Sequence, residues 1–198
     1  MKDKPELLPI RIIGDAVLRQ KAESVGQITD EIRDFAADLV HTMYLRDGVG
    51  LAAPQVGRSL RIFAVDPWWG REGRQKEPLV LIDPVIESSA GECVNEEGCI
   101  SIPGIYADVA RPSSITISFT GLDGQRRKLE LDGFPAIVMQ HEYDHLDGVL
   151  FTDRVSSLTK LKLKRRIKEL EKQTVDGVNI RLELPEGQDT DPASHSSL

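Results

Sequence analysis

Several features typical of membrane, secreted or nucleic-acid-binding proteins are absent or scarce in this sequence. It contains no run of about 18 apolar residues, so no transmembrane helix is expected. The charged start, Met1–Glu6, is followed by no apolar segment of the kind found in secretory signal peptides. Two cysteines are too few for a disulfide framework and fit a reducing cytoplasm. The net charge of −7 argues against binding to DNA or to nucleic acid in general.

The pattern that is present predicts one α+β domain. Hydrophobic residues make up 40% of the chain, which is enough for a substantial core. Helical spacing of apolar residues predicts helices at 29–46, 134–146 and 156–173, and strand-like stretches lie at 60–65, 79–82, 104–110, 114–120 and 126–131. Because helices do not alternate with strands, we expect mixed or antiparallel sheets packed around the helix at 134–146, with one helix near each end of the domain.

The boundaries of this domain follow from composition. Residues 1–173 are expected to form a single unit, and residues 174–198 a polar, acidic tail that is largely disordered beyond residue 185. Residues 48–57 are expected to form a glycine-rich loop, residues 87–99 are polar and punctuated by glycine, and Asp83-Pro84 is expected to end the strand at 79–82.

The most specific motif is the HExxH pentapeptide at residues 141–145. On a helix, positions i and i+4 share one face, so His141 and His145 can bind the same metal ion. Glu142 lies close enough to handle a proton. Two histidines do not complete a catalytic metal site, and a third ligand is needed.

Three residues compete to be that ligand. The longer H-E-x-x-H-x-x-G-x-x-H pattern is followed up to its glycine, but Phe151 stands where the third histidine belongs. Glu169 could serve from a later helix, although its lysine- and arginine-rich neighbourhood favours a solvated surface. Cys99 is favoured, because a thiolate is a strong ligand for a borderline-soft metal and leaves a fourth position for water. Cys93, in a polar stretch, is the weaker alternative.

With Cys99 included, the chain resembles the peptide deformylase family. The motifs that carry the resemblance are GVGLAAPQ at 48–55, EGCIS at 97–101 and HEYDH at 141–145. The resemblance implies a cytoplasmic, bacterial or organellar hydrolase that removes the N-formyl group from the formylmethionine of newly made polypeptides and releases formate. It also implies one divalent metal ion, typically Fe(II), with Zn(II) or Ni(II) able to occupy the same site. The ligand set alone does not separate iron from zinc.

The resemblance and the chemistry of amide hydrolysis together suggest roles for further residues. Glu142 would take a proton from the attacking water and return one to the departing amine. The Gln55 side-chain amide and the backbone N–H of Ile100 would stabilise the oxyanion. The residues expected to bind the substrate are Val49, Gly50, Glu97, Ile137 and Val138. Ordinary core packing is the alternative for the last two, and solvent exposure for Glu97.

Other interpretations stay open on the sequence alone. The chain could be a metallopeptidase that uses Glu169 as third ligand, or a non-catalytic metal-bound relative. The segment 156–173 is strongly basic and could form a solvated amphipathic helix with a buried stripe of Leu158, Leu161, Ile167 and Leu170. The resemblance suggests instead that this helix docks on the ribosome, where its charge would face RNA phosphates.

Overall fold

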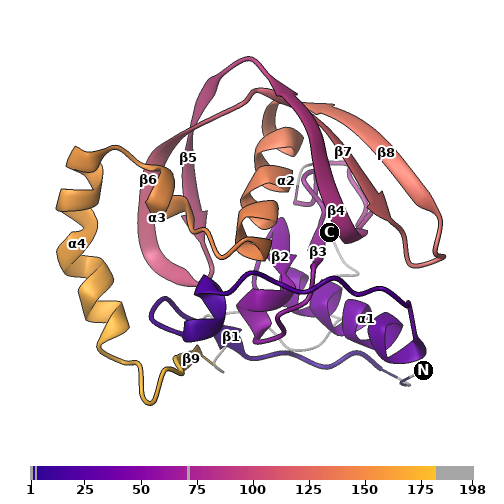
Figure 1. Cartoon of the computed structure of the whole chain (residues 1–198), viewed down its shortest axis with the longest axis horizontal. Helices are drawn as coiled ribbons and strands as arrows, with labels where there is room; N and C mark the ends of the chain where they lie inside the picture. The colour runs from indigo at the N-terminus through magenta and orange to yellow at the C-terminus, as the bar shows by residue number, and fades with distance from the viewer. Residues whose placement is uncertain (1, 3, 71, 182–198) are drawn as a thin grey trace.

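A computed structural model describes residues 2, 4–70 and 72–181 (Figure 1). The helices are α1 (Asp30–Leu45), α2 (Gly133–Leu146), α3 (Phe151–Arg154) and α4 (Ser157–Glu171), with 3-10 turns η1 (Ala16–Arg19) and η2 (Ala53–Val56). The strands are β1 (Ile10–Arg11), β2 (Gly50–Ala52), β3 (Ile62–Val65), β4 (Leu79–Ala90), β5 (Cys93–Cys99), β6 (Ile102–Arg111), β7 (Ser114–Thr120), β8 (Arg126–Asp132) and β9 (Ile180–Arg181). Mixed helices and antiparallel sheets confirm the α+β class.

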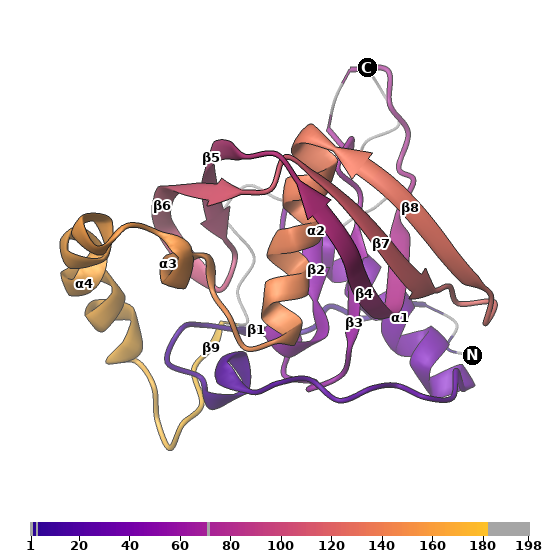
Figure 2. The same cartoon turned by 45° about the horizontal axis from the view of Figure 1, so that its top comes forward.

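The strands of the described residues form three antiparallel sheets. The largest has the order β2-β3-β4-β7-β8, and β5-β6 and β1-β9 form two smaller pairs. Figures 1 and 2 both show α2 between the β5-β6 pair and the large sheet. Apolar residues of α2, including Ala136, Met139 and Leu146, pack with Phe63 and Phe119 of the sheet in one hydrophobic cluster. The helix that carries the histidines is therefore held by core packing.

The predicted helices form for the local reasons that the sequence suggested. Thr29 caps α1, its hydroxyl accepting a hydrogen bond from the Ile32 N–H, and Asp30 lies in the positive first turn. Asp47 adopts a left-handed backbone conformation directly after the C-cap of α1. Pro135 lies in the first turn of α2, where its missing N–H costs no helical hydrogen bond. These helix predictions are confirmed.

Some strand boundaries were predicted wrongly. The strand beginning at Leu79 does not end at Asp83-Pro84 but continues to Ala90, with a register shift between Ile82 and Val85. Pro84 is accommodated at this irregularity, where the ladder does not need its N–H. The expected loop at 48–57 contains β2 and η2, and the polar stretch before Cys99 forms β5.

The end of the described chain returns to the body of the molecule. β9 pairs with β1, and the buried Asn179 side chain donates to the carbonyls of Ile13 and Leu170. The division of the chain at residue 173 stays a prediction, and the expected disorder beyond 185 lies outside the described residues. In the described part of the chain, no helix combines the length and apolar character needed to cross a membrane.

Candidate metal centre

Cys99, His141 and His145 converge at one point. Cys99 ends β5 at a register shift in the β5-β6 pairing, and the two histidines lie one turn apart on α2. One ligand atom from each residue lies within 4.8 Å of the others, and the Cys99 Sγ is 3.4 Å from the His145 Nε2. Cys93 stands apart from this cluster, with its thiol 3.5 Å from the Arg111 carbonyl.

The protonation of the two imidazoles is set by their surroundings. Burial would lower the pKa of His141, but hydrogen bonds to Cys99 and Glu97 outweigh it and raise that pKa well above its ordinary value. Burial, together with the charge of His141, lowers the pKa of His145 well below its ordinary value, so this ring is neutral. Metal binding at His141 would therefore displace a proton, whereas His145 is ready to coordinate.

A buried carboxylate orients His141. The Glu97 Oε2 lies 2.8 Å from the His141 Nδ1. Burial alone would raise the pKa of Glu97, but hydrogen bonds from Arg111 and His141 hold it below its ordinary value. An ionised carboxylate can only accept, so the Nδ1 carries the proton and the Nε2 is the nitrogen able to bind a metal.

Glu97 is itself held by Arg111, which the sequence analysis missed. Glu97 was expected near a pocket mouth but is only 5% exposed, and Arg111 donates to both of its oxygens. Arg111 also donates to Asp144 at 2.9 Å. A signal was available in the sequence, because alternate residues of β6 face inward and Arg111 continues the buried series of Ile105 and Val109.

Glu142 is buried beside Gly50 of β2. Glu142 is 4% exposed, and burial raises the pKa of its carboxyl group to about 7. Its Oε2 has no hydrogen-bond partner among the described residues. A Cβ at Gly50 would lie 2.4 Å from the Glu142 Oε1, so only glycine leaves room for this carboxylate.

Gln55 presents an amide donor to the same point. It lies in η2 and is buried, and its Oε1 accepts a hydrogen bond of 2.8 Å from the Ala52 N–H. This contact fixes the orientation of the amide, so the Nε2 donates toward the Cys99 Sγ and the Ser101 Oγ, each at 3.3 Å. Ile100 follows Cys99 and lines the same cleft.

The cleft beside these residues has a volume of about 460 Å³. Cys99, His141, Glu142 and Gln55 line it, together with the expected substrate-binding residues Val49, Gly50, Glu97, Ile137 and Val138. Ile137 and Val138 are also buried, so these residues both pack in the core and line the cleft.

The competing ligand assignments do not fit the structure. The Glu169 carboxylate lies on an exposed face of α4 and accepts a hydrogen bond from Arg165 at 3.2 Å, so the Glu169 metallopeptidase interpretation is wrong. Phe151 is buried, and its ring stacks against His141 with 6.2 Å between centroids. Gln140, the residue before His141, donates to the carbonyls of Pro112 and Ala136.

Comparison with known proteins identifies the family. The family model for polypeptide deformylase matches residues 7–161. The chain belongs to the peptide deformylase family. As a member of it, the chain is a hydrolase that removes the N-formyl group from nascent polypeptides, and the family is metal-dependent.

Individual peptide deformylases agree with this assignment. Those of Synechococcus sp. (strain CC9605) and Brucella suis biovar 1 (strain 1330) are 45% and 40% identical over 172 and 166 residues. These matches cover 86% and 83% of this chain and 85% and 94% of the relatives. The crystal structure of the Synechococcus elongatus peptide deformylase with actinonin has a TM-score of 0.77 at 43% identity, covering 89% of this chain and 94% of that one. A plant peptide deformylase structure has a TM-score of 0.80 at 34% identity, covering 87% and 94%.

Proposed function

We propose that this deformylase binds one divalent metal ion through Cys99, His141 and His145 and uses Glu142 to transfer protons. The observation that carries the proposal is the convergence of one thiol and two imidazoles at one point, beside a cleft that Cys99, His141 and the buried Glu142 line. The donor set fits a metal, because the 3.4 Å between Sγ and Nε2 matches the roughly 3.5 Å expected between two ligands of a tetrahedral ion with bonds of about 2.0–2.3 Å. Three protein ligands leave one position open.

The proposal also covers which ion occupies the site. Fe(II) is proposed for the cell and Zn(II) or Ni(II) as ions that can replace it, because imidazole and thiolate ligands accept all three. When bound, the ion would supply Lewis acidity that lowers the pKa of a water molecule from about 15.7 toward 7.

Glu142 is suited to both proton transfers. Its partner-free Oε2 can accept a proton from water as the formyl carbon is attacked, and its pKa of about 7 lets it return that proton to the leaving amine. Because the site is buried, the proton stays on the carboxyl group between the two steps. No second acid is needed.

The oxyanion and the substrate side chain would be held by neighbouring groups. The Gln55 Nε2 and the Ile100 N–H would donate to the developing negative charge, each donor being worth about 2.7–4 kcal/mol in other enzymes. Val49, Ile137 and Val138 would form the apolar slot for methionine, with the Gly50 backbone alongside the peptide. A formyl group is the smallest acyl group, so a close wall at the metal would exclude larger ones.

We extend the proposal to the surroundings of the enzyme. The helix α2 is proposed to lie at the centre of the sheets and to hold the two histidine ligands. The enzyme is proposed to act in the cytoplasm, on polypeptides that are still being synthesised. The basic helix α4 is proposed to contact the ribosome, because its exposed lysines suit RNA phosphates.

Formate release and metal content, measured after anaerobic purification, test the proposed roles. We expect Glu142→Ala to retain the metal and lose most turnover of formylmethionyl peptides, since it removes the proton carrier alone. Cys99→Ala and His145→Ala are expected to lose the metal itself, since each removes a ligand. Normal turnover by Glu142→Ala, or full metal content in Cys99→Ala, would contradict the assignment.

A further inference from the structure

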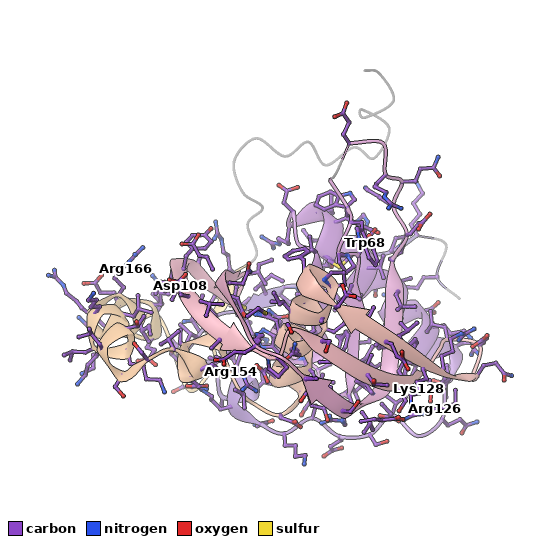
Figure 3. All side chains as sticks on the ribbon, turned by 90° about the horizontal axis from the view of Figure 1, so that it is seen from above. Trp68, Asp108, Arg126, Lys128, Arg154 and Arg166 are labelled. Carbon is purple, nitrogen blue, oxygen red and sulfur yellow. The ribbon has the colours of Figure 1, made fainter. Side chains whose placement is uncertain are left out.

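A continuous set of ion pairs runs from the surface of the molecule to His141. Arg154, the last residue of α3, lies near the outer surface (Figure 3) and its side chain is 43% exposed. Its Nε and Nη2 donate to the two carboxylate oxygens of Asp144, whose side chain is 7% exposed. Arg111 donates to the same Asp144 from the inside, and also holds Glu97, which accepts from the His141 Nδ1.

Each of the two carboxylates in this set is matched by a guanidinium group only when Arg154 is included. Two guanidinium groups, Arg154 and Arg111, face two carboxylates, Asp144 and Glu97. Without Arg154, a nearly buried Asp144 would depend on Arg111 alone. Arg111 is shared between the two carboxylates. If Asp144 lost Arg154, it would attract Arg111 more strongly and weaken the two hydrogen bonds from Arg111 to Glu97, because a buried carboxylate without a partner is destabilising.

We propose that Arg154 is a positioning residue: acting through Asp144, Arg111 and Glu97, it fixes the orientation of the His141 ring and so raises the affinity of the site for a divalent metal ion. This inference rests on the metal centre proposed above. Arg154 is not among the residues that line the cleft or form the Cys99–His141–His145 cluster, and its effect is carried by the geometry of the three intervening side chains. Groups behind metal-binding histidines tune metal affinity in other proteins, the nearest by about 10–100-fold.

The neighbouring ion pair Arg19–Asp153 provides a matched control. Arg19 is 47% exposed, as Arg154 is 43% exposed, and its Nη1 lies 2.5 Å from the Asp153 carboxylate on the same short helix. In the described part of the chain, neither Arg19 nor Asp153 contacts Asp144 or Arg111, although the charge of Arg19 contributes to the low pKa of His145. Removing Arg19 should therefore cost α3 a comparable ion pair without disturbing Glu97.

The test uses the full-length protein loaded with Co(II), whose visible absorption reports the ligand geometry. The wild type, Arg154→Met, Arg154→Lys and Arg19→Met are challenged with increasing chelator, and loss of the Co(II) bands gives relative dissociation constants. For Arg154→Met we expect the dissociation constant to rise about three- to tenfold, less than for a direct partner of the histidine, with altered visible bands. Arg154→Lys should recover part of the affinity. Arg19→Met should bind Co(II) at least as tightly as the wild type, because it leaves Glu97 in place and removes a positive charge that acts on His145.

The outcomes separate this inference from the proposed function. If the wild type shows no thiolate-bound Co(II) spectrum, the proposed metal centre is wrong. If the wild type binds Co(II) and both Arg154 variants bind it as tightly as the wild type does, Arg154 has no positioning role. Equal weakening in Arg19→Met and Arg154→Met would also overturn the inference, because loss of α3 packing would then explain both. If Arg154→Met does not fold, Arg154→Lys decides: unchanged affinity and bands overturn the inference.

Discussion

The packing of Glu142 against Gly50 is the closest steric constraint on a proton-carrying group in this site. An added Cβ at position 50 would approach the carboxylate oxygen to 2.4 Å and the Cγ and Cδ to 2.8 Å. Such distances require the Glu142 side chain to move. At Gly48, by contrast, the nearest atoms to an added Cβ are backbone oxygens at 3.2 and 3.3 Å, which small shifts can accommodate.

We therefore expect Gly50→Ala to lower kcat about 100-fold while the metal stays bound, because misplacing a catalytic group by about 1 Å has that effect in other enzymes. The metal ligands lie on α2 and β5 and are not displaced by this change. Formate release and metal analysis on the same preparation measure the two quantities. Gly48→Ala is the control and should retain most activity; a Gly50→Ala enzyme with wild-type kcat would show that Glu142 does not need its observed position.

Single residues of the site differed in how far sequence could predict them. His141, Glu142 and His145 follow from local helix periodicity, because four-residue spacing alone brings them to one face. Cys99 could be predicted only by excluding the other candidate ligands, since its distance from the histidines depends on how β5 packs. The partners Arg111 and Arg154 were not predicted. The alternation along β6 could have indicated that Arg111 is buried, but the ion pairs of both arginines join separate elements and leave no local spacing to recognise.

Elements with a clear period were predicted well, and irregular ones were not. The strands β6, β7 and β8 and the helices α1, α2 and α4 carry regular apolar spacing, and they lie close to the predicted ranges. β4 was cut short because proline normally ends a ladder, and β5 was missed because its residues are mostly polar. Both exceptions depend on bulges and long-range pairing that only the folded sheet supplies.

The apolar stripe of α4 was predicted correctly for Ile167 and Leu170 but wrongly for Leu158 and Leu161. Leu163 is buried, and Ile167 and Leu170 pack partly against the core, whereas Leu158 and Leu161 are 65% and 69% exposed. The spacing of four and three residues between 163, 167 and 170 is also helical, so periodicity alone could not decide between two overlapping stripes. The result is a helix at one end of the molecule (Figure 1) on which two leucines and several lysines are exposed.

For the proposed ribosome contact, we expect Lys160→Glu, Lys164→Glu and Lys168→Glu combined to abolish co-sedimentation with ribosomes at low salt. These lysines are exposed and spaced four residues apart on one side of α4, so their reversal replaces attraction to phosphate by repulsion. Deformylation of a free peptide should not change, because the cleft lies elsewhere. The same charge change at Arg126, Arg127 and Lys128 of β8, at the other end of the molecule (Figure 3), is the control. Unchanged sedimentation of the α4 variant would remove the proposal.

At the scale of the whole molecule, one asparagine ties together the two ends of the described chain. The Asn179 Nδ2 donates to the carbonyls of Ile13 and Leu170, its own N–H donates to the Asp15 carboxylate, and its carbonyl accepts from the Ile12 N–H. The N-terminal segment, α4 and the returning chain thus meet at a residue that is only 4% exposed. Nothing in the polar composition after residue 173 predicted this contact.

Replacing Asn179 by alanine should lower the free energy of unfolding by about 1–3 kcal/mol, because two carbonyl oxygens lose their buried donor. Urea denaturation of the full chain, followed by far-UV circular dichroism, measures the change. Gln173→Ala is the matched control, since its amide lies in the same segment but is exposed, and its effect should be close to zero. If Asn179→Ala unfolds at the same urea concentration as the wild type, the two side-chain hydrogen bonds of Asn179 add no stability. The returning chain would then be held by the backbone bonds of residue 179 and by the pairing of β9 with β1.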